Sequence, residues 1–294
     1  MKEIQREEIY GYLFVSPWLI GYILFIAFPV VYSLVISLYK YTLPFTIKFT
    51  GFSNYKEIFY DPLFRTALYN TAYYTILAVP LGIIASIIIA LILNMKLKGI
   101  SYFRTIYYMP AVISGVAVSL LWLVLLDPSS GLINYLLSLL HIRGPVWLQD
   151  PKWAKPALII MSLWQSGGNM IIYLAGLQQI PEQLYEAATI DGANSWYKFW
   201  RITLPLLTPT IFLSLVLSII GSFQIFTQAY IMTGGGPLNS TLFYVLYLYQ
   251  KGFQSFEMGY ASALAWILFV VVLVLTIIVF KTSWRWVYYE AEVK

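Results

Sequence analysis

The chain has 294 residues, of which 60% are hydrophobic and 11% are charged, and its formal net charge is +5. A soluble domain usually carries about 25% charged residues, so the composition argues strongly against a protein that is surrounded by water. The basic residues lie scattered at the ends of apolar runs, which favours membrane anchoring over nucleic-acid binding, and the absence of cysteine with a single histidine predicts no metal site and no disulfide.

Six runs without Asp, Glu, Lys or Arg follow one another along the chain. Each can hold the roughly 20 apolar residues that a helix needs to cross a bilayer, and none alternates as a barrel strand would. The glycine-rich segment Thr233–Pro237 interrupts the longest run and predicts a loop. We therefore predict an all-α membrane protein, with residues 1–294 as a single transmembrane domain and helices at about 11–38, 71–94, 104–126, 156–178, 204–231 and 259–281.

The first apolar run is too long for a cleaved signal sequence, so we expect it to stay as an anchor. Lys96, Lys98 and Arg104 fill the short connection after the second helix, and such clusters favour the cytoplasmic side. Six spans then place both termini and the loop 179–203 in the cytoplasm, and the loops 39–70 and 127–155 outside. No phosphate-binding glycine loop is present, so an ATPase that powered transport would be another chain.

The loop 179–203 predicts two short helices joined by a turn. Pro181 suits a helix start, Gly192 can adopt the left-handed conformation that ends a helix, and Ser195 can cap a second helix. From the residues alone, two interpretations stay open. The element is either a docking surface for a soluble partner or an amphipathic linker that lies on the membrane surface.

A resemblance decides between them. Glu186-Ala187-Ala188, then Gly192 after three residues, then Ile202–Pro205 after nine more, resembles the EAA signature of ABC importer permeases. Leu174–Leu177 with Ile180-Pro181, the segment Thr233–Pro237 and Gly259–Ala263 resemble the sugar importers of the maltose type. The resemblance covers roughly residues 10 to 285.

The resemblance implies a type I importer fold in a prokaryotic plasma membrane. It implies that the 179–203 loop forms coupling helices that sit on a separate ATPase, with the chain itself neither an enzyme nor a binder of ATP and Mg. Two non-identical permeases, two ATPase subunits and an external solute-binding protein would form the importer. The coupling residues would be Tyr185, Glu186, Ala187, Ala188, Asp191 and Gly192.

Polar residues inside the fourth and fifth predicted helices are the candidates for a substrate pathway, because polar groups in spans tend to face the bundle interior. Sugars need neutral hydrogen-bonding groups and aromatic faces, which amides, hydroxyls, Trp164 and Phe223 would supply. For Ser214, Gly221 and Gly168, helix–helix packing is the favoured alternative. The residues, with the resemblance to maltose-type sites, give as candidates Trp164, Gln165, Gly168, Asn169, Ser218, Gly221, Ser222, Gln224, Ile225 and Thr227.

Two alternatives compete with a sugar-importer permease. A secondary transporter would need buried charges for ion coupling, and a membrane-embedded enzyme would need clustered acids or histidines; the predicted spans hold almost none. Within ABC importers, a charged solute should require Arg or Lys in the spans. The sequence therefore favours a neutral oligosaccharide. Gly168 and Ile225 lack side-chain hydrogen-bonding groups, which argues for a different sugar from maltose or a site mostly on the partner permease.

Overall fold

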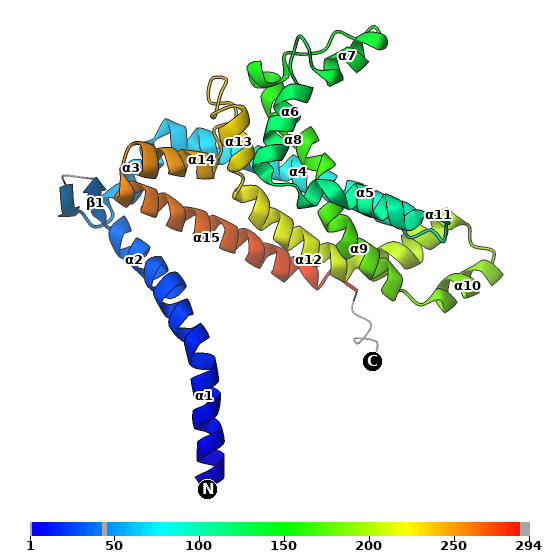
Figure 1. Cartoon of the computed structure of the whole chain (residues 1–294), viewed down its shortest axis with the longest axis horizontal. Helices are drawn as coiled ribbons and strands as arrows, with labels where there is room; N and C mark the ends of the chain where they lie inside the picture. The colour runs from blue at the N-terminus through cyan, green and yellow to red at the C-terminus, as the bar shows by residue number, and fades with distance from the viewer. Residues whose placement is uncertain (1, 43–45, 289–294) are drawn as a thin grey trace. The chain divides into compact units, whose positions relative to one another are not determined.

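The computed structural model describes residues 2–42 and 46–288, and most of them are helical (Figure 1). They fall into two compact units. The first is formed by the residues up to Asp61 together with Leu248–Phe269, and the second by Pro62–Tyr247 together with the residues from Val270 onward. The helix α15 (Met258–Ser283) therefore contributes its first half to one unit and its second half to the other.

In the first unit, one long helical span leads into a small hairpin. The span runs over Tyr10–Ser37 and includes a π-helical turn. The hairpin pairs Tyr39 with Phe49 and Thr42 with Thr46 in antiparallel register. The elements in chain order are α1 (Lys2–Tyr22), η1 (Ile23–Ala27), α2 (Phe28–Ser37), β1 (Tyr39–Thr42), β2 (Thr46–Phe49), α3 (Ser53–Tyr60), η4 (Gln250–Gln254) and the start of α15.

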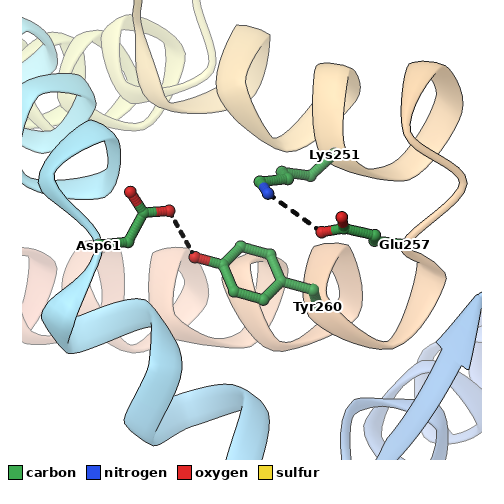
Figure 2. Close-up of polar contacts among 4 residues, drawn as sticks. All are labelled: Asp61, Lys251, Glu257 and Tyr260. Atoms are coloured by element: carbon green, nitrogen blue, oxygen red, sulfur yellow. Dashed lines mark hydrogen bonds and ion pairs between the residues drawn. The ribbon is translucent and has the colours of Figure 1, made fainter.

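Polar side chains hold the parts of this unit together. The Asn54 side chain donates to the carbonyls of Ser37, at 2.7 Å, and Tyr39, at 2.9 Å, which fixes α3 against the hairpin. Figure 2 shows a second group, in which the Tyr260 hydroxyl donates to Asp61 at 2.7 Å and Lys251 pairs with Glu257 at 3.1 Å. These contacts order the end of the 39–61 segment against the start of α15.

The second unit is built around α4, which packs against α9 and α12. Its apolar core takes residues from these three helices, among them Ile83, Tyr173 and Leu207. The elements are α4 (Pro62–Leu93), α5 (Ile100–Val112), α6 (Gly115–Leu125), α7 (Leu132–Leu139), η2 (Trp147–Gln149), α8 (Pro151–Trp164), α9 (Gly167–Gln179), α10 (Glu182–Ile190), α11 (Ser195–Lys198), η3 (Phe199–Thr203), α12 (Leu204–Phe223), α13 (Thr227–Met232) and α14 (Tyr244–Tyr249), the last of which ends beyond the unit boundary.

The described helices give six candidate spans when each bent pair is counted as one, and two of the predicted spans are such bent pairs. The span predicted at 104–126 is α5 and α6, bent by 99°, and that at 156–178 is α8 and α9, bent by 45°. The span predicted at 204–231 breaks between α12 and α13. Two residues account for the bend between α5 and α6. Ile113 has an extended backbone that ends α5, and the Ser114 side chain accepts a hydrogen bond from Ala117 N that starts α6.

The bend between α8 and α9 has a different cause. Ser166, Gly167 and Gly168 follow one another there and are poor at continuing a helix. The Ser166 carbonyl accepts the helical hydrogen bond from Met170 N at 3.1 Å and also a buried hydrogen bond of 2.9 Å from the Ser86 side chain of α4. The neighbouring helix therefore helps to hold the bend.

Candidate transport site

A cavity of about 390 Å³ lies in the second unit, at the points where its helices bend or break. The α8–α9 bend and the α12–α13 break face it, and α4 closes a third side. Interrupted helices turn polar groups toward an interior space, as in many transport sites. Its lining comprises Tyr74, Ala78, Val79, Gly82, Ser162, Gln165, Ser166, Asn169, Ser218, Gly221, Ser222, Gln224, Ile225, Phe226, Thr227 and Gln228.

The lining is polar and uncharged. Amides come from Gln165, Asn169, Gln224 and Gln228, and hydroxyl groups and the rings of Tyr74 and Phe226 add to them. None of the described residues around the cavity is Asp, Glu, Lys, Arg or His. Such a surface can exchange many neutral hydrogen bonds with a ligand, and it offers no counter-ion to a charged one.

Part of this polar lining is tied up in the protein, and part is available. Asn169 donates to the Ser218 hydroxyl at 3.4 Å, and the Ser222 hydroxyl lies 2.9 Å from Thr75 Oγ1. In the described part of the chain, the side-chain amides of Gln165 and Gln224 make no side-chain hydrogen bond. Within the described residues the Gln228 side chain makes none either, so these three amides are the groups in the cavity with the most unused hydrogen-bonding capacity.

Eight of the ten predicted pathway residues line this cavity, and two do not. Trp164 instead packs edge-on against Trp122, with ring centroids 6.2 Å apart. At Gly168, an added Cβ would lie 3.3 Å from the Ala111 side chain, which is the packing role proposed as its alternative. The eight that line the cavity are Gln165, Asn169, Ser218, Gly221, Ser222, Gln224, Ile225 and Thr227.

The expected aromatic groups are also different from those observed. Phe223 is 4% exposed and is not part of the lining, whereas Tyr74 and Phe226 are. Ser214 is fully buried away from the cavity, as the packing interpretation expects. Sequence reasoning missed the whole α4 contribution, although Tyr74, Ala78 and Gly82 recur at intervals of four residues, the spacing of one helix face.

The second candidate site is the turn between α10 and α11. The helix α10 ends in a Schellman motif, in which Ala193 N donates to the Ala188 carbonyl at 2.8 Å and Gly192 N to Thr189 at 3.0 Å. Gly192 has a φ of +78°, which favours glycine. The cap of α11 is Asn194, whose side chain accepts from Tyr197 N at 2.8 Å, so the predicted cap at Ser195 is wrong by one residue.

Hydrogen bonds hold this turn in place, and several of its residues are exposed. The Tyr185 hydroxyl lies 2.9 Å from Thr203 Oγ1, and Lys198 donates to the Thr189 hydroxyl at 2.7 Å. The opposite side presents the other predicted coupling residues to the surroundings. Glu186, Ala187, Asp191 and Gly192 are exposed, while Ala188 and Tyr185 are partly buried.

An ion pair joins the start of α10 to the basic connection between α4 and α5. Lys96 Nζ lies 2.9 Å from Glu182 Oε1, and the hydrogen bond that Lys96 donates to Glu182, with the charges of Glu182 and Glu186, raises the pKa of Lys96. Both side chains are largely exposed, so the pair adds little stability. It does establish that the α4–α5 connection and the start of α10 lie at the same end of the second unit.

Comparison with known proteins identifies the family of the chain. Residues 68–283 match the family described as "Binding-protein-dependent transport system inner membrane component". The probable ABC transporter permease protein YesP of Bacillus subtilis is 43% identical over 99% of this chain and 96% of its own length. The lactose transport system permease protein LacF of Rhizobium radiobacter is 38% identical, with 94% of each chain covered.

A solved structure gives the same answer for the fold. A chain in the crystal structure of a bacterial alginate ABC transporter, in complex with an alginate pentasaccharide-bound periplasmic protein, superimposes with a TM-score of 0.84. It is 28% identical, and the match covers 97% of this chain and 96% of that one. The chain therefore belongs to the family of binding-protein-dependent transport system inner membrane components, as a multi-pass ABC importer permease with the type I fold.

Proposed function

We propose that this permease forms half of the translocation pathway for a neutral oligosaccharide. The observation that carries the proposal is the cavity between α4, α8–α9 and α12–α13, because its lining combines free amides, hydroxyls and two aromatic rings with no charged side chain. Sugars are recognised by this combination. Relatives named for lactose and for arabinooligosaccharides support the substrate class.

The charge of the cavity separates this proposal from its main alternative. One structural neighbour belongs to a transporter "involved in the import of the acidic polysaccharide alginate". An acidic sugar, or another charged solute, would favour Arg or Lys at the binding surface, since burying an unpaired charge is costly. The described lining offers neither. A neutral sugar is therefore the substrate that fits this chain best.

The same proposal assigns ATP hydrolysis to other chains. Two ATPase subunits would bind ATP and Mg. One of them would dock on the exposed turn between α10 and α11, with Glu186 and the small Ala187 at the contact. A second, non-identical permease would supply the other wall of the pathway, and a solute-binding protein would deliver the sugar from outside. The turn is rigid and projects from two spans, so a movement of the ATPase would reach the pathway helices directly.

The membrane is proposed to be a prokaryotic plasma membrane, with both termini in the cytoplasm. Lys96 and Lys98 lie in a short connection at the same end of the unit as α10, and basic connections favour the cytoplasmic side. With four spans before α10 and two after it, the N-terminus and the C-terminus share that side.

Substitution of the free amides tests the function. In an importer reconstituted with its partner subunits, Gln165→Ala and Gln224→Ala should each raise the KM for transport of the sugar by about three- to tenfold, which corresponds to one lost hydrogen bond. Gln254→Ala is the matched control, because Gln254 is an exposed amide of the first unit that does not line the cavity.

The substrate is tested in the same assay with a panel of neutral sugars, acidic sugars and amino acids. Uptake of a neutral sugar that depends on ATP, and weakens in both cavity variants but not in the control, supports the proposal. Uptake of only an acidic or charged solute would contradict the sugar assignment. Uptake without ATP or partner subunits would contradict the importer assignment.

A further inference from the structure

A large hollow of the second unit lies outside the proposed pathway, in the connection between α6 and α8. It is a groove of about 1440 Å³ beside α7. Sites for drug-sized ligands usually measure about 300–1,000 Å³, so the groove is large enough for an extended ligand. The span formed by α8 and α9 separates this connection from α10, so the groove and the coupling turn lie at opposite ends of that span.

Asn134 of α7 makes the walls of the groove rigid. Its side-chain nitrogen donates to the carbonyls of Pro128 and Pro145, each at 3.2 Å, and its oxygen accepts from the buried Trp147 indole at 2.7 Å. One side chain thus joins α7 to the chain on both sides of it. A binding surface that is already ordered loses less conformational entropy when a ligand binds.

The turn that leads into α7 is equally well ordered. Asp127 accepts four hydrogen bonds, from the backbone and side chains of Ser129 and Ser130, at 2.8 to 3.0 Å. The backbone hydrogen bond from Ser130 is the largest of the effects that lower the pKa of Asp127, so this carboxylate stays ionised at neutral pH. Hydrogen bonds of Asp127 and Asn134 therefore hold the 127–150 connection in a defined conformation.

The lining of the groove combines aromatic and polar side chains with aliphatic ones, among them Leu132, Ile142 and Val146. Trp153 is 41% exposed although it packs edge-to-face with Trp147, with ring centroids 5.6 Å apart, and Tyr135 is 60% exposed, so Tyr135 and the remaining surface of Trp153 are available for stacking. Arg143 and Asp150 lie on the lining as one positive and one negative group, which leaves its net charge at zero. Ser138 adds a hydroxyl group. Aromatic faces beside polar groups fit the apolar face and hydroxyl rim of a sugar.

A third hollow lies next to the groove and next to the helix that lines the inner cavity. Thr227 and Gln228 of α13 line the inner cavity, whereas Met232 at the other end of α13 lines a third space of about 400 Å³. That third space shares Pro128 with the groove. The groove and the third space thus adjoin at Pro128, and the third space and the inner cavity lie at the two ends of α13, as three separate hollows of one compact unit.

From this arrangement we propose that the α7 groove is an external binding subsite for the distal sugar units of an oligosaccharide whose leading units enter the inner cavity. The inference rests on the proposed sugar function and adds a chain-length preference to it. The groove would bind units beyond those that the inner cavity holds. A disaccharide would not need it, whereas a hexasaccharide would.

The test compares a disaccharide and a hexasaccharide of the same neutral sugar in the complete reconstituted importer. Trp153→Ala and Tyr135→Ala should each raise the KM for the hexasaccharide by about tenfold, from the loss of one stacking contact, and leave the disaccharide KM unchanged. Trp153→Phe keeps a ring and should restore most of the hexasaccharide affinity. Leu140→Ala is the control, because Leu140 is 69% exposed on the same connection but does not line the groove.

Each other outcome overturns the proposal in a distinct way. Equal changes for both sugars would mean that the variants act on the inner cavity or on folding. Weaker binding of the sugar-free binding protein to the Trp153→Ala importer would make the groove a protein-docking surface. A wild-type importer that moves the disaccharide but not the hexasaccharide would contradict only the proposed role of the groove. An importer that moves no sugar would contradict the proposed function as well.

A second measurement observes the groove directly. The chain has no cysteine, so Ser138→Cys creates a unique labelling site on the lining. A polarity-sensitive fluorophore at that position, in the complete importer, should respond to the hexasaccharide at lower concentration than to the disaccharide. The same response to both sugars would contradict the chain-length preference.

Discussion

The backbone at Gly192 determines how the coupling turn is shaped. Its φ of +78° is costly for any residue with a side chain, yet no atom lies within 4 Å of where a Cβ would be. Gly192→Ala therefore adds strain of about 1 kcal/mol and no steric clash. If the turn is the docking site for the ATPase, the variant should retain less ATPase subunit on the affinity-purified permease and hydrolyse ATP more slowly when sugar is delivered.

Gly51 provides a control for that strain. It also has a positive φ, +57°, with open space around its Cβ position, and it lies in the first unit. Gly51→Ala should cost similar stability, measured as a similar small fall in Tm, without loss of the ATPase subunit. Equal retention of the ATPase by the Gly192→Ala variant and the control would contradict the coupling role.

For single residues, the sequence predicted those that belong to a local motif. It missed those whose role depends on how the helices pack. Pro181 and Gly192 predicted a helix that ends at a left-handed glycine and is followed by a second helix, all of which the structure has. The α11 cap was misplaced because Asn194 and Ser195 are both good caps. Tyr74 was missed because an aromatic residue in an apolar helix carries no local signal of a cavity.

Among the helices, the crossing of α5 and α9 depends on a single glycine. An added Cβ at Gly167 would collide with the Tyr107 carbonyl, which is backbone and cannot move aside cheaply. Gly167→Ala should therefore destabilise the permease by about 1–3 kcal/mol, the usual cost of overpacking. The measurement is the Tm of the purified permease in detergent.

Gly82 is the matched position on α4. It also lies inside a helix, but no atom comes within 4 Å of its Cβ position. Gly82→Ala should raise stability slightly, by about 0.5–1 kcal/mol, because alanine favours the helix more than glycine does. A fall in Tm for Gly82→Ala as large as that for Gly167→Ala would contradict a steric cause.

Length and hydropathy were sufficient to predict the spans, but they do not predict where a span bends. The 99° bend after α5 needs an extended Ile113 and a cap at Ser114, both ordinary residues in an apolar run. The β1–β2 hairpin was also missed, although Tyr39 and Tyr41 alternate with polar residues as strands do. A search for long apolar runs passes over such a short segment.

For the molecule as a whole, the two proposals depend on the same property, namely which end of the second unit faces the cytoplasm and which faces outside. The coupling turn must face the cytoplasm to meet an ATPase, and the α7 groove must face outside to meet a delivered sugar. These two elements are separated by the one span of α8 and α9, so a single orientation satisfies both requirements or neither.

The cysteine-free chain makes this orientation directly measurable. Gln183→Cys lies in α10 and Ser138→Cys in α7, and both native side chains are exposed. In intact cells, a membrane-impermeant maleimide should label Ser138→Cys and should label Gln183→Cys only after the membrane is permeabilised. The reverse pattern would place the basic Lys96 connection outside and remove the coupling turn from any cytoplasmic ATPase. Labelling of both positions in intact cells would mean that α8 and α9 form a re-entrant hairpin rather than a span, because then α7 and α10 would share one side.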